Sequence, residues 1–533
     1  MAEARAETKS RPQGRRGDPQ TGEPARKRLD PGALARAALL PTLSGVIYFL
    51  GWIGFGIWPL AFICLVPLIY SLRGTTWKGA LGRGAWMGFV THLGGYTWIV
   101  HLLKVFAGLD GALQPLAFLG YLLVCAGQGL LFGVFAAVFR VAWIRTRWPL
   151  VLLTPLALVA TEFVYPLLFQ SYTGAALMPL SPLMQVADLG GALLTSALVA
   201  VSCGAVADVI LGSPARRAGA IVVTAVVFAA AGGYGRYRIA DTERREREAP
   251  KRRTALAQPN IGEIELHRNP NASVKALWGL TAEAHSRLAE LVVWPEVGFN
   301  THLVNLQQAE AARYIQNGIP LALIAGIERA SGKDRWNSAV MISKAGQFGD
   351  HFDKIQLLAF GEYIPFGDVF PIFYRWSPMS SHLSRGTTTE PLRDGAFSYA
   401  TFICYEDILP GIVRQTMAAR DGKRPQAMVN LTNDSWYGTG HEQEQHLQLA
   451  AMRSIEHHRW LLRATSTGIS AFIDGSGRVV QRIARDRQGL LVRDVPMLQG
   501  ETAYEKYGDW PGWLSLGALA VGMAVLGRGR KGG

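Results

Sequence analysis

Charged residues are scarce in this chain. Asp, Glu, Lys and Arg together make up 18% of its 533 residues, whereas hydrophobic residues make up 49%. With a mean hydropathy of +0.15, this composition argues against an ordinary soluble protein. It favours a membrane protein, or a membrane protein that carries a soluble module.

Cysteine is also rare, with four residues in the whole chain and no C-x-x-C pair. This spacing argues against a zinc site, a thioredoxin-like pair and a disulfide framework. Cys64, Cys125 and Cys203 lie inside apolar segments, where we expect them to be small buried hydrophobic residues. Cys404 is different because it lies in FICYEDILP, directly before a tyrosine and two acids.

Signatures of nucleic-acid binding are missing, although the net charge of +14 could suggest such a partner. The positive charge is densest in the first 36 residues and in short patches between apolar runs. Charge in such positions is typical of cytoplasmic loops of membrane proteins. We therefore predict no nucleic-acid partner.

Long apolar runs are what the chain has in abundance. Each is close to the roughly 20 residues with which a helix crosses the bilayer core. They cover approximately residues 33–50, 52–72, 84–103, 113–139, 149–169, 187–212, 218–235 and 510–527. The sequence therefore predicts a polytopic helical bundle of about eight spans. Residues 1–31, rich in Arg, Pro, Gly and Glu, are predicted to form a disordered cytoplasmic tail.

The charges of the loops predict the orientation. Basic segments alternate with nearly neutral ones, and basic loops stay on the cytoplasmic side. The basic segments are 73–83, 140–147, 213–217 and 528–531, and the nearly neutral ones are 104–112 and 170–186. Eight spans then place both termini in the cytoplasm and residues 250–500 outside. Segment 236–253 is basic too, but it also carries acids and opens a long translocated domain, where the charge rule is weak.

The predicted domains are therefore a tail (1–31), a seven-span membrane domain (32–236), a catalytic domain (250–500) and a final span (508–528). Within 250–500, runs rich in Val, Ile, Phe and Thr alternate with segments of helical spacing. This alternation predicts an α/β or layered α+β domain.

Ionisable residues follow three of the predicted strands. LVVWPE ends in Glu296, DKIQLLAFGEYIPF holds Lys354 and Glu362, and FICYED holds Cys404. Because the thiolate is the nucleophilic form of cysteine, a nearby carboxylate can act as the base. An ammonium group and a backbone N–H can hold the resulting oxyanion. We predict Glu296 as base, Cys404 as nucleophile and Lys354 as oxyanion stabiliser, with the N–H of Tyr405 as a second donor.

The order of these motifs resembles a known family. WPE, K-x-x-L-x-x-F-G-E-Y-x-P and I-C-Y-E-D occur in the order of the nitrilase (carbon–nitrogen hydrolase) superfamily. NLTNDSWYG, LRATSTGISAFID and the seven-plus-one apolar runs are similar to bacterial apolipoprotein N-acyltransferases. The resemblance covers about residues 33–527. It implies an extracytoplasmic α-β-β-α sandwich and a Glu–Lys–Cys triad at Glu296, Lys354 and Cys404.

The resemblance also implies supporting roles around the triad. Glu362 matches the family's supporting glutamate, and a structural ion pair with Lys354 is an equal alternative. Tyr405 and Glu406 match the pair after the nucleophile, with Glu406 expected to orient the site rather than act as a second base. The segment QPNIGEIELHRNP lacks the tryptophan that the family often has there, so no role is transferred to it.

Other polar motifs receive the simpler interpretation. In HEQEQH the two histidines are five residues apart, whereas a zinc-binding helix needs four, so we predict a solvated helix start and no metal. Trp436 and Tyr437 are expected in the core rather than at a lipid-facing mouth. Glu162 and Asp188, in or near the spans, are left without a role.

The resemblance predicts lipoprotein N-acylation through a cysteine thioester. A phospholipid would donate the acyl chain, and the amino group of a diacylglyceryl-cysteine would accept it, in the bacterial inner membrane. We expect a monomer without cofactor, and mobile loops within 363–395 that keep water from the thioester. The alternatives are a membrane-anchored amidase and a transporter with a large binding domain. The spans of a transporter should carry paired charges, and this chain has few charges within its apolar runs, which argues against the transporter.

Overall fold

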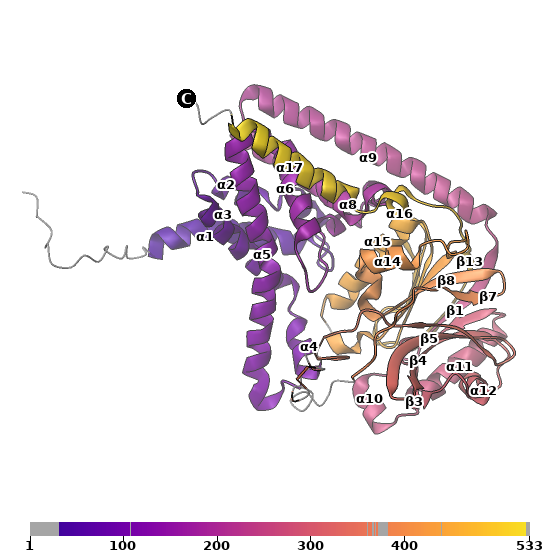
Figure 1. The fold of residues 1–533 in the computed structure, drawn as a ribbon. Coiled ribbons are helices and arrows are strands. Elements are labelled where there is room, and N and C mark those ends of the chain that lie inside the picture. The colour runs from indigo at the N-terminus through magenta and orange to yellow at the C-terminus, as the bar shows by residue number, and fades with distance from the viewer. Residues whose placement is uncertain are drawn as a thin grey trace, which may run out of the picture.

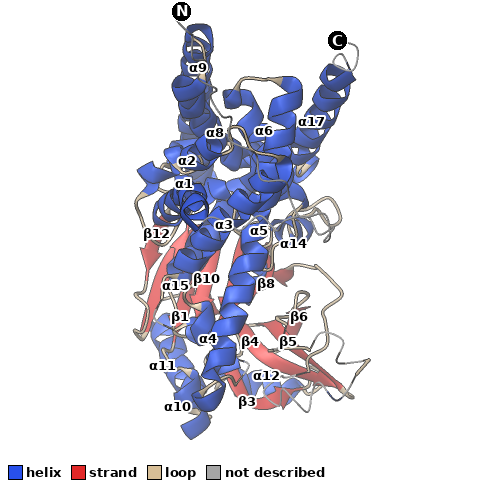
Figure 2. Ribbon diagram, turned by 90° about the vertical axis from the view of Figure 1, so that its left-hand side faces the viewer, coloured by secondary structure: helices blue, strands red, loops and turns tan. Residues whose placement is uncertain are grey.

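The computed structural model describes residues 31–528, apart from 107, 360, 365, 366, 368, 371, 373–381 and 439. Apolar helices form one part of the molecule and two β-sheets with their own helices form the other (Figure 1). A view from the side places the strands at one end and α6, α9 and α17 at the other (Figure 2). The predicted tail, residues 1–31, lies outside the described residues except for Pro31.

The helical part is built mainly from long apolar segments. Its elements are α1 (Pro31–Gly51), η1 (Trp58–Ile63), α2 (Val66–Ser71), α3 (Trp77–Gly95), α4 (Ile99–Phe106), η2 (Gly111–Leu113), α5 (Gln114–Thr146), α6 (Leu150–Val164), η3 (Thr173–Leu177), α7 (Ser181–Met184), α8 (Ala187–Leu211), α9 (Pro214–Glu248) and α17 (Trp510–Arg528). Among the described residues, Gly111–Thr146, Ala187–Leu211 and Pro214–Glu248 are long and apolar enough to cross a membrane. Four shorter apolar helices, Ala37–Gly51, Trp58–Ser71, Leu150–Val164 and Trp510–Val525, accompany them.

Two of the predicted apolar runs are divided between separately bounded helical elements. In run 52–72 the chain turns at Gly54 and Gly56, which both have positive φ, and then forms the short elements η1 and α2. Positive φ suits glycine and interrupts a right-handed helix. Run 84–103 is divided between α3 and α4, with Tyr96 closing α3. Apolar composition alone does not reveal such breaks.

The first sheet belongs to the second part of the molecule. Its strands are β1 (Lys251–Gln258), β2 (Leu291–Val293), β3 (Phe299–Val304), β4 (Ala322–Ser331), β5 (Asp334–Ile342), β6 (Phe348–Asp353) and β13 (Gly489–Pro496). They lie in the order β13-β1-β2-β4-β5-β6, and β3 pairs with β4 outside this path. β1, β2 and β4 run parallel, so their carboxyl ends meet at one edge.

The second sheet contains β7 (Leu392–Asp394), β8 (Phe397–Ile403), β9 (Ala427–Thr432), β10 (Leu461–Thr465), β11 (Ala471–Ile473) and β12 (Val479–Arg482). Its order is β12-β11-β10-β9-β8-β7, with β8, β9 and β10 parallel. All six residues of β9 are buried, as expected for a central parallel strand covered on both faces.

Helices cover the outer faces of the two sheets. A shared apolar core joins the inner faces, for example Val293 of β2 with Val429 of β9. α11 (Ala272–Ser286) and α12 (Ala309–Gln316) pack on the first sheet, beside the short α10 (Glu263–Arg268). α14 (Pro410–Thr416) and α15 (Glu442–His457) pack on the second sheet. The predicted layered α-β-β-α arrangement is therefore present.

Helix α15 is covered on both sides. Leu447, Ala450 and Ala451 face the second sheet, whereas Leu449 and Met452 belong to the core of the apolar helices. The side chain of Gln445 accepts from Trp98 Nε1 at 3.2 Å and donates to the Gly95 carbonyl at 3.2 Å. The predicted solvated start of this helix is therefore wrong, because Glu442, Gln443 and His446 are buried where the two parts meet.

Helix α9 links the two parts without a break. It has 35 residues, about 52 Å at the α-helical rise, and only Ala249 and Pro250 separate it from β1. Glu246 near its end accepts from Trp460 Nε1 at 2.7 Å and from the Gly475 N–H at 3.0 Å. The predicted basic segment 236–253 is therefore mostly a helix packed on the sandwich.

Asp188, which the sequence left without a role, lies at the start of α8 and connects three elements. Its carboxylate accepts from Tyr234 Oη at 2.8 Å and Arg238 Nε at 2.8 Å in α9, and contacts His458 Nε2 at 2.9 Å. Glu162 in α6 accepts from the N–H and hydroxyl of Thr173. Both acids therefore have structural contacts in the described part of the chain.

Candidate active site

The three predicted catalytic residues line one cavity between the sheets. Glu296 follows β2, Lys354 follows β6, and Cys404 follows β8, where it opens the turn η4 (Cys404–Ile408). The cavity has a volume of about 570 Å³ and is also lined by Glu362. The structure therefore brings together the ends of strands from both sheets, as the sequence predicted for these side chains.

The backbone is strained at Cys404, the predicted nucleophile, and directly after Glu296, the predicted base. Cys404 has φ +56° and Val297, directly after Glu296, has φ +45°. Positive φ is uncommon for residues other than glycine, and a β-branched residue there is a clear outlier. Each such residue costs of the order of 1–3 kcal/mol and persists where surrounding contacts hold it. At Cys404 this conformation makes an abrupt turn from β8 into η4.

Glu296, Lys354 and Glu362 form one buried ion network. Lys354 Nζ lies 3.3 Å from Glu296 Oε1 and 2.8 Å from Glu362 Oε1. Asn337 Nδ2 donates to the same two oxygens at 2.8 and 3.2 Å. Glu296 Oε2 accepts from the Asn433 N–H at 2.9 Å. Within the described residues, two of the three N–H groups of Lys354 have acceptors.

The electrostatics keep the lysine charged and the thiol protonated. Burial alone would lower the pKa of Lys354, but the Glu296 and Glu362 carboxylates outweigh it and hold that pKa well above its ordinary value. Burial, reinforced by Glu296, raises the pKa of the Cys404 thiol well above its usual range. Burial also raises the pKa of Glu296, even though Lys354 opposes the shift. A base with a raised pKa is better matched to accepting a proton near neutral pH.

Glu406 connects the segment after Lys354 with the segment before Cys404. Its Oε1 accepts from the N–H groups of Ile355 and Gln356 at 2.7 and 2.9 Å, and its Oε2 accepts from Ile403 N–H at 2.9 Å. These groups directly follow Lys354 and directly precede Cys404. Burial raises the pKa of Glu406 to about 7, although these N–H donors oppose the shift. Its contacts are those of an orienting residue.

Comparison with known proteins identifies the family. A model of the apolipoprotein N-acyltransferase N-terminal domain matches residues 44–205, and a carbon–nitrogen hydrolase model matches residues 253–504. A relative from Pseudomonas aeruginosa PAO1, named apolipoprotein N-acyltransferase, is 30% identical over 92% of this chain and 96% of its own length. The chain belongs to the apolipoprotein N-acyltransferase family. It is therefore an enzyme, and the transporter hypothesis is dropped.

Other relatives of the same name agree. The apolipoprotein N-acyltransferase of Azotobacter vinelandii is 28% identical over 92% of this chain and 95% of its own length. That of Bdellovibrio bacteriovorus is 29% identical over 91% and 93%. Among solved structures, a mutant of the Nesterenkonia AN1 amidase from the nitrilase superfamily is 21% identical, with a TM-score of 0.36, over 46% of this chain and 92% of that one. No residue role is taken from that likeness.

Three asparagines at this N-acyltransferase site were missed by the sequence reasoning. Asn337 contacts both glutamates, the N–H of Asn433 holds Glu296, and Asn430 Nδ2 donates to the Cys404 carbonyl at 2.9 Å. The motif NLTND contained a usable signal, because Asn430 and Asn433 lie at the end of a predicted buried strand. Asn337 gave none, since it lies within a strand whose partners the sequence does not reveal.

Aromatic residues form part of the wall. Trp436 and Tyr437, in the turn η5 (Asp434–Tyr437), line the cavity of Cys404. Tyr437 also belongs to the core of the apolar helices, and Trp436 packs against that core, as the sequence predicted. Tyr405 Oη donates to the Leu357 carbonyl at 3.1 Å, and its ring lies 5.8 Å from Lys354 Nζ. The predicted lid segment, 363–395, lies partly outside the described residues.

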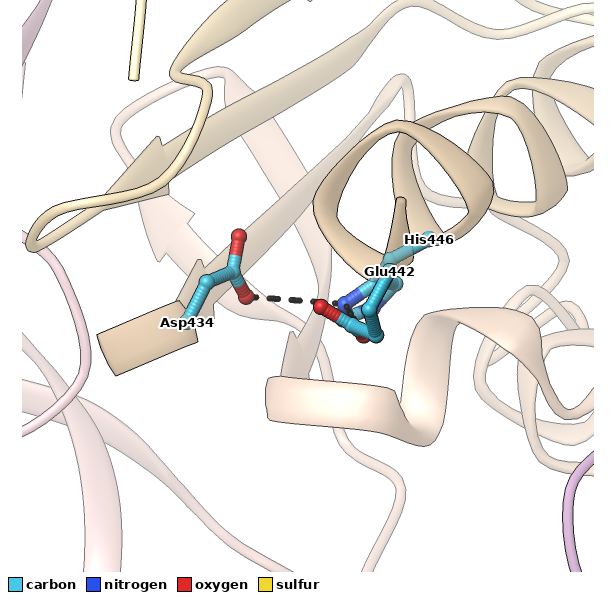
Figure 3. A group of neighbouring side chains, drawn as sticks. All are labelled: Asp434, Glu442 and His446. Atoms are coloured by element: carbon cyan, nitrogen blue, oxygen red, sulfur yellow. Dashed lines mark ion pairs between the residues drawn. The ribbon is translucent and has the colours of Figure 1, made fainter. Parts of the chain in front are cut away.

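Two acids and a histidine lie close together near the site. Single ligand atoms of Asp434, Glu442 and His446 lie within 4.8 Å of one another, and all three residues are buried (Figure 3). Glu442 and His446 are four residues apart on α15, a spacing that the comparison of histidines alone had missed. Asp434 Oδ2, however, is already 2.9 Å from Arg463 Nη2, which supplies a positive charge.

Proposed function

We propose that the enzyme N-acylates the diacylglyceryl-cysteine of lipoproteins by a two-step transfer through Cys404, with Glu296 as base and Lys354 as oxyanion stabiliser. The relatives' name supports the overall reaction. The cavity that holds a cysteine, two glutamates and a lysine supports the residue roles. Glu362, Tyr405 and Glu406 are proposed as supporting residues.

In the first step the Cys404 sulfur attacks an ester carbonyl of a phospholipid. The thiol proton passes to Glu296 as the S–C bond forms, and the oxyanion is held by Lys354 and the Tyr405 N–H. The C–O bond then breaks, and Glu296 returns the proton to the leaving alkoxide. The products of this step are a thioester at Cys404 and a lysophospholipid.

In the second step the α-amino group of the acceptor attacks the thioester carbonyl. The N–C bond forms and the C–S bond breaks. Glu296 takes the proton of the amine and gives it back to the sulfur, which restores the thiol. Because burial raises the pKa of the Cys404 thiol, the thiol stays protonated until Glu296 accepts the proton during attack.

We propose eight spans, with both termini in the cytoplasm and the sandwich on the outer face of the inner membrane. This placement brings the cavity near two lipid-anchored substrates. The proposed domains are the tail (1–31), the seven-span part (32–236), the catalytic part (250–500) and the final span (508–528). No metal, cofactor or nucleic acid is needed for this chemistry, and one chain supplies every proposed catalytic group.

The observation that carries the proposal is the shared cavity of Glu296, Lys354 and Cys404 in a member of this family. The test incubates purified wild type and Cys404→Ala with labelled phospholipid. Without acceptor, wild type should release one equivalent of lysophospholipid and keep the label on the Cys404 peptide. With a diacylated lipopeptide, turnover should follow. Normal transfer by Cys404→Ala contradicts the mechanism, and continuous hydrolysis of small amides instead of transfer supports the amidase alternative.

A further inference from the structure

Two aspartates, an arginine and a histidine, all buried behind the site, form a closed ring in which acids and bases alternate. His446 Nε2 lies 2.8 Å from Asp407 Oδ1, and Arg463 Nη1 lies 3.0 Å from Asp407 Oδ2. Arg463 Nη2 lies 2.9 Å from Asp434 Oδ2, and His446 Nδ1 lies 3.5 Å from Asp434 Oδ1. None of the four residues is more than 3% exposed. Each acid is therefore bridged by the same two cations.

The two acids of the ring lie in two turns next to the proposed catalytic groups: one turn carries Cys404, and the other contacts Glu296. Asp407 belongs to η4, the turn that begins with Cys404. Asp434 directly follows Asn433, whose N–H holds Glu296. Arg463 Nη1 also donates to Asn430 Oδ1 at 2.9 Å, and Asn430 in turn donates to the Cys404 carbonyl. The ring is thus attached to both the nucleophile and the base, although it touches neither reacting group.

The ring is neutral only when His446 is an imidazolium. Burial and Arg463 lower the pKa of His446, but Asp407 and Asp434 outweigh them and raise it to about 9. The other acid facing the ring is Glu442, whose Oε1 lies 3.6 Å from His446 Nδ1 (Figure 3). Burial raises the pKa of Glu442 to about 8, so it is mostly neutral at pH 7. Loss of the His446 charge leaves a buried carboxylate uncompensated, which is strongly unfavourable.

We propose that His446, with Arg463, is a positioning residue that fixes the turn of Cys404 relative to the turn that holds Glu296. The inference rests on the proposed roles of Cys404 and Glu296. His446 acts through charge balance: with the ring neutral, both turns are held in one arrangement. With one cation removed, Asp407 and Asp434 repel each other and the two turns separate.

Alkylation of Cys404 by iodoacetamide tests this without any lipid substrate. The reaction is followed at pH 7 by mass spectrometry of the Cys404 peptide, in detergent. His446→Gln keeps a donor for Asp407 but removes the charge. We expect its alkylation to slow by about 10- to 100-fold, as for a misplacement of about 1 Å. The matched control is His285→Gln on the exposed face of α11, which should react at the wild-type rate.

A charge-balanced double variant separates positioning from mere packing. In Asp407→Asn with His446→Gln, the remaining Arg463 and Asp434 are neutral together, and the two amides can hydrogen-bond. We expect alkylation to recover to within about threefold of wild type and the melting temperature to rise above that of His446→Gln. If His446→Gln does not fold, the double variant is compared directly with wild type.

Three outcomes overturn the inference. The first is a double variant that is as slow as the single one, or unfolded. The second is a His446→Gln enzyme that reacts at the wild-type rate. The third is one equivalent of zinc per chain in the purified wild type that is lost in His446→Gln, because the balancing charge would then be a metal. Since alkylation needs no lipid, none of these results depends on whether phospholipid is the donor.

Discussion

Gly326 in β4 lies directly beneath the turn that carries the proposed base. A Cβ atom added there would lie 2.1 Å from the Pro295 carbonyl oxygen, 2.8 Å from Val297 N and 2.9 Å from the Glu296 Cα. All three contacts are with the backbone, so no side chain can rotate away to relieve them. Gly326→Ala should therefore push the turn, and Glu296 with it, away from the strand.

The size of the effect follows from these distances. A carbon and a carbonyl oxygen need a separation of roughly 3.3 Å, so the turn must retreat by about 1 Å. A misplacement of about 1 Å in a catalytic group can cost about 100-fold in rate, or roughly 2.7 kcal/mol of transition-state stabilisation. Overpacking of this kind lowers the free energy of unfolding by about 1–3 kcal/mol. The rate of thioester formation should therefore fall while most of the enzyme remains folded.

The assay is single-turnover thioester formation from labelled phospholipid, with the melting temperature measured in the same detergent. Gly349→Ala in β6 is the matched control, because a Cβ there would have Met341 as its nearest neighbour, at 3.5 Å. The control should lose less than threefold in rate. A folded Gly326→Ala enzyme that forms the thioester at the wild-type rate would refute the reasoning, since it would show that the position of Glu296 does not limit the first step.

Two further predictions concern residues that join segments. Glu406→Gln leaves one of three backbone N–H groups, that of Ile403, without an acceptor, so both the melting temperature and the thioester rate should fall, with a loss of about 1–3 kcal/mol in unfolding free energy. Unchanged melting would contradict this role. Asp188→Asn weakens the contacts to Arg238 and His458, so the unfolding free energy should fall by a similar amount and the melting temperature should fall with it. The rate per folded molecule should stay within about twofold of wild type. A large loss of rate without loss of stability would speak against a purely structural Asp188.

Much of the site was predictable because its residues follow strands. Glu296, Lys354 and Cys404 each come after a run of strand-forming residues, and parallel strands present their carboxyl ends at one edge. The sequence therefore pointed to these positions before any contact was known. It could not find Asn337, because the value of that side chain depends on which strand lies beside it: β5 pairs with β6, and this pairing brings Asn337 beside Lys354.

The start of α15 shows a second limit of the sequence. Glu442, Gln443 and His446 are polar, and polarity normally marks a solvated helix face. Here the helix lies between the second sheet and the apolar helices, so its polar groups bind partners within the protein. A sequence pattern reports that a face is polar, but not whether water or a buried ion network satisfies it.

The unbroken α9 has a mechanical consequence. A helix of 35 residues that enters an interior strand of a sheet after only two residues leaves little free chain between the two parts. The final helix α17 returns to the apolar helices and contacts α6. The sandwich is therefore connected to these helices at both ends, through α9 and through α17. Attachment at both ends argues against a catalytic part that swings between two substrates. In the proposed two-step transfer, the phospholipid and the lipoprotein would therefore each have to diffuse to Cys404, one after the other.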